Sequence, residues 1–244
     1  GEYIENIDFL GKEITVTSHI FFDNNSDFIE QTIIDGNEES CVVVFRNLEG
    51  RNSVLRGFTI QNGVQNYGGG IDCQHGTSPL LCDLIVTQNE ARFHGGGIYC
   101  TGRCNPLIER TLINRNHADC GGGFSISWDG HAELCDVRIL ENTSESGGSG
   151  IHNYGTARYT LNRVLISANA PHTPVAIFGD GQESSVFRNV TIAGNRSEST
   201  DCILNWGGDL NLLNCILIGD GGDLLVGGSE DRRNTINISY CNID

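Results

Sequence analysis

Aromatic residues that recur at a fixed spacing are the part of this sequence best suited to bind a ligand. Trp128, Tyr154, Asp180 and Trp206 follow one another at intervals of 26 residues, and both tryptophans of the protein belong to this column. An aromatic ring offers an apolar face and a polar edge, which together suit a sugar ring. The column therefore predicts a shallow glycan-binding track, whereas the competing interpretation is an aromatic stack that packs a corner of the fold.

Polar side chains beside this column could hydrogen-bond to sugar hydroxyls. They are Asp129, His152, Asn153, Asp180, Asn205 and Asp209. Asp129 and Asp180 are also the best available pair of carboxylates for glycoside hydrolysis, which needs two such groups about 5 to 9.5 Å apart. A lyase would need a basic residue instead, and the single lysine, Lys12, has no acidic cluster beside it. We therefore expect a non-catalytic protein, with a polysaccharide lyase or glycosidase as the alternative.

Two groups of residues have some features of a metal site, and each is incomplete. Asp220 and Asp223 lie in a Gly-Asp-Gly-Gly-Asp turn that resembles a calcium-binding turn, but a single copy supplies few oxygen ligands. Cys100 and Cys104 have the spacing of a zinc ligand pair, although structural zinc sites usually have two such pairs. The histidines in neighbouring segments are His75, His94 and His117. We expect no cofactor and keep calcium as the alternative.

Ten cysteines in an acidic chain indicate an oxidising compartment and therefore export. Cys73 and Cys100 occupy the same position in adjacent repeats, and so do Cys215 and Cys241. Side chains stacked on adjacent parallel strands are close enough for a disulfide if their geometry is also right. These two pairs are therefore disulfide candidates, with a bond between Cys100 and Cys104, or buried free thiols, as alternatives.

A repeat of 26 or 27 residues must position all of these side chains. Three columns of apolar residues recur in phase, and each column predicts one short strand per turn. The first is Ile34, Ile60, Val86, Ile113, Ile139, Ile166, Ile192 and Ile218; the second is Val44, Ile71, Ile98, Phe124, Ile151, Ile177 and Ile203; the third is Leu55, Leu81, Ile108, Leu134, Leu161, Phe187 and Leu213. Because connections between parallel strands are almost always right-handed, we expect a right-handed parallel β-helix of about eight or nine coils.

Asparagine and glycine mark the corners of each turn. Asparagines three residues beyond the first apolar column predict a ladder of side chains that bond to one another and to the turn backbone. They are Asn37, Asn89, Asn116, Asn142, Asn169 and Asn195. Glycine runs at 68–70, 95–97 and 121–123 open the second strand and predict a sharp corner rather than a phosphate-binding loop.

The segment from Gly95 to Asn116, with its Gly-Gly-Gly-Ile-x-Cys element and asparagine corner, resembles the repeats of secreted bacterial right-handed β-helix proteins. It is also distantly similar to the repeats of chlamydial polymorphic outer-membrane proteins. The openings at 2–12 and 32–37 look like the first turns of such proteins. The resemblance implies the fold and a surface or extracellular location, but members of this broad group include lyases, glycosidases and adhesins. It also implies that a strand normally precedes Gly1.

The composition fits one domain spanning residues 1–244. There are 15 basic and 31 acidic residues, and a net charge of −16 would repel nucleic acids. No apolar run reaches the length of a transmembrane helix, about 18 residues. Open coil ends expose strand edges, so we expect a piece of a longer protein or a subunit that self-associates through its ends. The leading hypothesis is a non-catalytic extracellular β-helix module, such as a stalk, adhesin or filament subunit, with affinity for a glycan.

Overall fold

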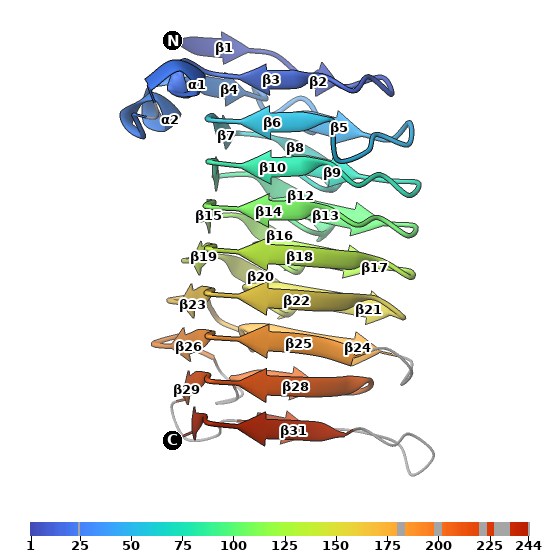
Figure 1. Ribbon diagram of the computed structural model, residues 1–244, viewed down its shortest axis with the longest axis vertical. Helices are drawn as coiled ribbons and strands as arrows, with labels where there is room; N and C mark the ends of the chain where they lie inside the picture. Colours follow the sequence, from blue (N-terminus) through green and yellow to red (C-terminus); the bar gives the residue numbers. More distant parts are fainter. Residues whose placement is uncertain (24, 180–183, 198–201, 220–223, 227–234, 244) are drawn as a thin grey trace.

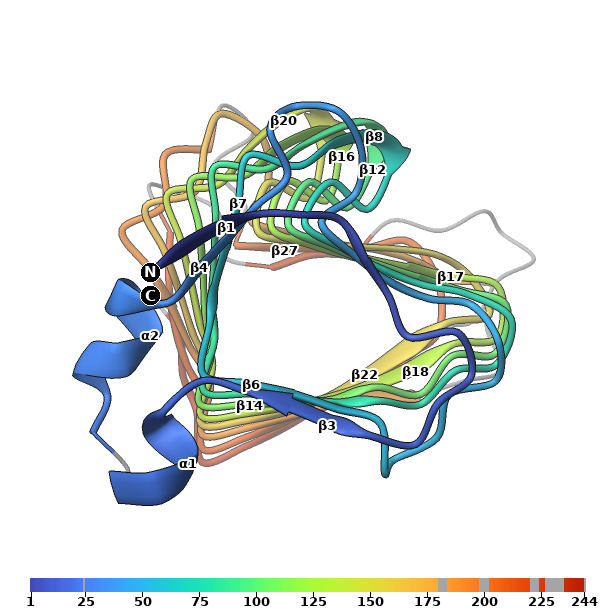
Figure 2. The same ribbon diagram turned by 90° about the horizontal axis from the view of Figure 1, so that it is seen from above.

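The computed structural model describes residues 1–23, 25–179, 184–197, 202–219, 224–226 and 235–243, and it shows a parallel β-helix (Figure 1). Viewed from the N-terminal end, the chain winds clockwise as it recedes, so the coil is right-handed (Figure 2). The predicted fold class is therefore confirmed. All of the paired strands run parallel in the described part of the chain.

Three long sheets line the coil, and each turn contributes one strand to each of them. Sheet A contains β1 (Glu2–Ile4), β4 (Ile33–Asp35), β7 (Thr59–Gln61), β11 (Ile85–Thr87), β15 (Leu112–Asn114), β19 (Arg138–Leu140), β23 (Leu165–Ser167), β26 (Thr191–Ala193), β29 (Ile216–Ile218) and β32 (Asn242–Ile243). Sheet B contains β2 (Ile7–Asp8), β5 (Val43–Phe45), β9 (Ile71–Cys73), β13 (Ile98–Thr101), β17 (Phe124–Ser127), β21 (Ile151–Gly155), β24 (Val175–Gly179), β27 (Ile203–Asn205) and β30 (Leu224–Val226). Sheet C contains β3 (Thr15–Thr17), β6 (Val54–Arg56), β10 (Leu80–Cys82), β14 (Leu107–Glu109), β18 (His131–Cys135), β22 (Arg158–Asn162), β25 (Ser184–Arg188), β28 (Asp209–Leu213) and β31 (Ile236–Ser239).

A fourth, shorter sheet projects from the coil between sheets A and B (Figure 2). This sheet D contains β8 (Val64–Tyr67), β12 (Glu90–His94), β16 (His117–Cys120) and β20 (Thr143–Gly147). Its strands are mostly polar, so the apolar columns that predict three strands per turn do not reveal it. The glycine corner follows each of these strands and turns the chain sharply back into sheet B.

The glycine corner depends on the absence of side chains. Gly95 and Gly121 adopt φ of 69° and 68°, which glycine reaches without strain. A Cβ on Gly96 would collide with the carbonyl of His117 in the next turn. Sheet D can therefore lie close to sheet B only because these positions are glycine.

The interior of the coil is filled by in-register apolar ladders, as the repeat predicts. Ile34, Ile60 and Val86 pair in adjacent strands of sheet A and are buried. Four positions of the predicted columns are displaced by one or two residues because some turns differ in length. The residues that actually complete the ladders are Leu217 rather than Ile218, Val43 rather than Val44, Val175 rather than Ile177, and Leu212 rather than Leu213.

The predicted asparagine ladder runs through five turns, from Asn89 to Asn195. From Asn116 to Asn195, each side-chain oxygen accepts hydrogen bonds from both the backbone N–H and the Nδ2 of the asparagine one turn before, at 2.9 to 3.1 Å. Asn89 Oδ1 accepts from the N–H of Gly63 instead. Each Nδ2 also donates to a backbone carbonyl of the preceding turn, as Asn142 does to Ile113. Asn37 is exposed at a left-handed turn and lies outside this ladder.

Two short helices, α1 (Ile20–Asp23) and α2 (Asp27–Gln31), lie beside the first turns between β3 and β4 (Figure 1). The apolar columns do not predict them. Within the described residues, no helix is both long and apolar enough to cross a membrane.

Asn142→Ala should lower the free energy of unfolding by roughly 3 to 5 kcal/mol, because several buried partners would lose their hydrogen bonds together. Asn116 would lose the acceptor of two bonds, and the carbonyl of Ile113 would lose a donor. Chemical denaturation measures the change, and the exposed Asn52→Ala is the matched control. A loss below about 1 kcal/mol would contradict this role for the ladder.

Candidate glycan-binding face

The outer face of sheet B and the adjacent sheet D form the candidate functional site. Side chains of a strand alternate between its two faces, so Ile71 and Cys73 point into the coil and Asp72 points out. The outward column nearest sheet D contains Val44, Asp72, Tyr99, Ser125, His152 and Ala176. The second outward column contains Gln74, Thr101, Ser127, Tyr154, Phe178 and Trp206.

Ring contacts join the two sheets and continue along this face. Tyr67 of sheet D stacks on Tyr99 with ring centroids 5.2 Å apart, and His94 lies 5.5 Å from His152. The run continues from His152 to Phe178 at 5.5 Å and from Phe178 to Trp206 at 6.1 Å. Contacts in this range are typical of favourable aromatic pairs. Sheet D therefore forms a wall beside a face covered by rings.

All three aromatic residues of the predicted column remain open to solvent. Trp128, Tyr154 and Trp206 are 58%, 51% and 49% exposed, and the rings of Trp128 and Tyr154 meet edge to face at 5.6 Å. Rings that only packed a corner would be more deeply buried. The exposure therefore favours the binding interpretation over the packing interpretation.

The column differs from the one that a constant spacing of 26 residues predicts. Tyr154 pairs with Ser127, not with Trp128, in the preceding turn and with Phe178 in the next turn. Trp128 therefore lies one residue beyond the column, in the turn after β17. Trp206 follows Asn205, which pairs with Ile177. Phe178 thus occupies the position expected for Asp180, because this turn is two residues shorter than the repeat. Asp180 itself lies outside the described residues, as do Asp220 and Asp223, the calcium candidates.

His152, one of the predicted glycan-binding residues, is buried beneath the rings rather than exposed beside them. It is 4% exposed, and burial together with nearby His94 lowers its pKa to about 3. Its Nδ1 lies 3.5 Å from the hydroxyl of Ser125. The neutral imidazole therefore packs against the rings of Phe178 and His94.

Asp129 lies in the turn after β17 and is exposed. Its carboxylate forms an ion pair with Arg103 at 3.6 Å and accepts a hydrogen bond from the hydroxyl of Thr156. The structure does not describe its proposed catalytic partner, so the pairing stays a prediction. In the part of the chain that the structure describes, no three His, Cys, Asp or Glu side chains are grouped so that they could hold a metal ion.

None of the ten cysteines forms a disulfide, so the two predicted bonds are absent. Cys73 and Cys100 are in-register neighbours in sheet B, and Cys241 Sγ accepts a hydrogen bond from the N–H of Cys215 at 3.3 Å. In-register side chains on parallel strands run side by side about 4.8 Å apart. A disulfide requires Cβ atoms that converge to about 3.8 Å, and this geometry explains why stacking alone does not make a bond.

A cavity of about 270 Å³ at the N-terminal end of this face was not predicted from the sequence. Asp72 lines it and is only 6% exposed, and burial raises the pKa of its carboxyl to about 7. Gln74 donates to Asp72 Oδ2, but Oδ1 is buried and has no hydrogen-bond partner. Arg46 and Tyr67 also line the cavity. The only sequence signal was an aspartate at an outward position where neighbouring turns have valine, tyrosine or serine.

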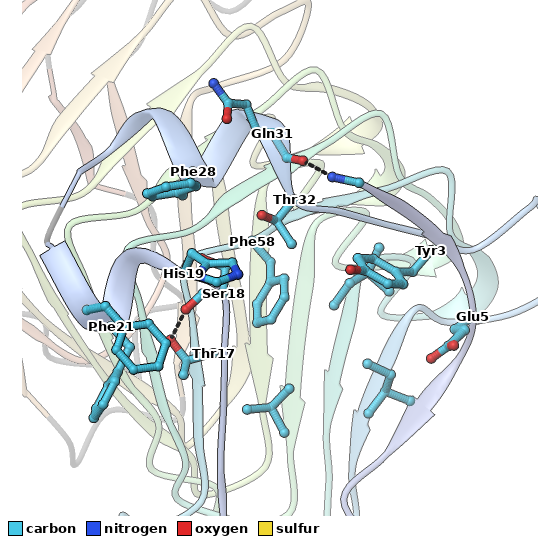
Figure 3. A pocket seen from close by; sticks show the side chains of 15 residues that line it. Tyr3, Glu5, Thr17, Ser18, His19, Phe21, Phe28, Gln31, Thr32 and Phe58 are labelled. Atoms are coloured by element: carbon cyan, nitrogen blue, oxygen red, sulfur yellow. Dashed lines mark hydrogen bonds between the residues drawn. The ribbon is translucent and has the colours of Figure 1, made fainter.

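A larger cavity of about 640 Å³ lies at the N-terminal end of the coil and has a different character (Figure 3). The side chains that surround it are largely apolar, including Tyr3, Phe21, Phe28 and Phe58. Helices α1 and α2 supply part of its rim. Its position makes it an opening of the core rather than part of the aromatic face.

His152→Gln should make the protein less sensitive to acid. The pKa of His152 is about 3 in the folded state against 6.5 for a free histidine, so the unfolded chain binds more protons between these values. Its contribution to stability is therefore present above pH 6.5 and is lost as the pH falls towards 3. Thermal melts from pH 7 to 4 should fall less steeply for the variant than for the wild type, whereas exposed His75→Gln should leave the slope unchanged. Equal slopes for all three proteins would contradict the prediction.

The geometry of the face combines exposed rings, a polar wall and one buried carboxyl beside a cavity. Comparison of the chain with models of protein families, with curated proteins and with solved structures finds no match.

Proposed function

We propose that this chain is an extracellular β-helix module that binds an extended glycan along the outer face of sheet B. The observation that carries the proposal is the set of aromatic rings on this face: Trp128 meets Tyr154 and Phe178 meets Trp206, and the rings of Trp128, Tyr154 and Trp206 are about half exposed. Sugar rings bind to such surfaces through their apolar faces while their hydroxyls contact polar side chains.

The repeat supports an extended ligand rather than a compact one. Adjacent turns place equivalent residues about 4.8 Å apart, so the face extends in one direction with a regular spacing. Thr101 and Gln74 offer polar groups beside the rings, and Asp129 does so together with its ion-pair partner Arg103. A linear polymer can contact several turns at once, and several weak contacts then combine into useful affinity.

A passive binding role fits the described carboxylates better than catalysis does. Asp129 is occupied by Arg103 and Thr156, and the inward-facing residues are packed. The alternative remains a polysaccharide lyase or glycoside hydrolase that acts on an extracellular polysaccharide. A screen of acidic and neutral polysaccharides for new reducing ends or unsaturated uronates tests it. Turnover that is abolished by Asp129→Asn would contradict the proposed passive role.

Trp206→Ala and Trp128→Ala should each weaken glycan binding about tenfold or more, because stacking of one ring contributes about 1 to 2 kcal/mol. The melting temperature should change by no more than a few degrees, since both rings are about half exposed. A glycan array followed by calorimetry measures binding. The matched control is Tyr240→Ala, an exposed aromatic residue in the corner between sheets C and A. Unchanged affinity, or a large loss of stability, would favour the packing interpretation.

We also propose that copies of this chain associate through their coil ends. Strands β1, β2 and β3 are the terminal strands of their sheets, and Phe21 and Phe22 are exposed beside the apolar cavity at this end. Unpaired strand edges and exposed rings both favour association.

Sedimentation should therefore show association that increases with concentration, and Phe22→Ser should weaken it. Leu48→Ser removes an exposed apolar side chain from a turn that follows sheet B and is the matched control. A monomer at all accessible concentrations would contradict the proposal.

A further inference from the structure

We propose that the cavity around Asp72 binds the ammonium group of an amino sugar, so that the glycan recognised by this face carries free amines. This inference deepens the proposed glycan binding and depends on it. It specifies the chemical class of the ligand and assigns Asp72, Gln65 and Tyr67 to a defined subsite.

The first support is an unsatisfied carboxyl oxygen. Asp72 is almost completely buried, and its Oδ1 has no hydrogen-bond partner although it belongs to a side chain that lines the cavity. A buried acceptor without a donor is costly, and native proteins rarely keep one without a reason. A ligand that supplies an N–H or O–H donor at this point would remove the cost.

The second support is the sign of the local charge. Arg46 lines the same cavity and lowers the pKa of Asp72, but its Nη2 is 2.5 Å from Asp8 Oδ2, so part of its charge is compensated by another acid. The chain as a whole carries a net charge of −16, which attracts cationic ligands and repels anionic ones. A protonated amine therefore fits this cavity better than a carboxylate or a phosphate.

The third support is the rest of the lining, which suits a sugar rather than a simple amine. Gln65 and Asn66 supply amide groups and Ser40 supplies a hydroxyl, all within the cavity wall. Tyr67 is 40% exposed and provides a ring for the apolar face of a sugar and for an ammonium group. A volume of about 270 Å³ is small for a ligand pocket, which suits one sugar unit of a longer chain.

Several ionisable groups surround Asp72 and must be considered together. They are Arg46 after β5, Tyr67 of β8, Tyr99 of β13 and the buried thiols of Cys41 and Cys73. Arg46 is the one cation among these groups and lowers the pKa of Asp72 only in part, because burial dominates. Ammonium binding should therefore ionise Asp72 and release a proton near neutral pH.

The test compares three tetrasaccharides of equal length and β-1,4 linkage. They are the glucosamine tetramer, its N-acetylated form and cellotetraose, which differ in the group on the second carbon. Calorimetry at pH 7 should show at least about tenfold tighter binding of the free amine, because a hydrogen bond to a charged group is worth roughly 1.5 to 3 kcal/mol. Carboxyl NMR should show the pKa of Asp72 falling from about 7 when the glucosamine tetramer saturates the protein.

Asp72→Asn keeps the shape of the side chain and should abolish the preference for the amine, while circular dichroism confirms that it folds. Asp136→Asn removes the same charge from an exposed corner that follows sheet C, outside this face, and should keep the preference. Absence of an amine preference, or a preference that survives in Asp72→Asn, overturns the inference, and so does failure of all three sugars to bind.

The outcomes also separate this inference from the proposed function. Equal binding of the three sugars that is lost in Trp128→Ala would retain the aromatic face and reject the amine site. An amine preference that depends on Asp72 but is unchanged in Trp128→Ala, two turns from Asp72, would retain the amine site and reject the extended aromatic track.

Discussion

In-register pairing of each turn with the next is the interaction on which the rest of this structure depends. A parallel ladder places equivalent residues of successive turns at the strand spacing, so any residue type that recurs in the sequence becomes a continuous stack in space. Inside the coil the stacks are apolar. At the corner after sheet A the stack is asparagine, and each buried amide satisfies backbone groups that a sharp turn would otherwise leave without partners.

The same register produces the candidate site on the outside of the coil. Glycines 95–97 and 121–123 allow the chain to fold sheet D back beside sheet B, and the rings of Tyr67 and His94 then cover the outward side chains of sheet B. A wall of this kind buries groups that an open sheet would leave in water. Asp72 and His152 are two such groups, since both are ionisable and almost completely buried.

Burial acts on these two groups with opposite signs. It raises the pKa of Asp72 from 3.8 to about 7, so the folded state binds the extra proton and this contribution to stability declines as the pH rises through that range. It lowers the pKa of His152 from 6.5 to about 3, so its contribution declines as the pH falls through that range. The wall beside sheet B therefore makes the free energy of unfolding depend on pH in both directions. Of the two buried groups, Asp72 also lines a cavity, where a ligand could offset the cost of its burial.

The sequence by itself determined the coil, its apolar ladders and the asparagine corner, because a repeat of nearly fixed length makes these features visible as regular spacing. The right hand of the coil follows from the general preference of parallel strand connections. The sequence also identified the exposed rings of Trp128, Tyr154 and Trp206. Tertiary structure alone decided the site around them. A turn shortened by two residues places Phe178 in the column, and the polar sheet D carries no apolar signal. Burial of Asp72 depends on how residues from different turns meet, and one-dimensional spacing does not contain that information.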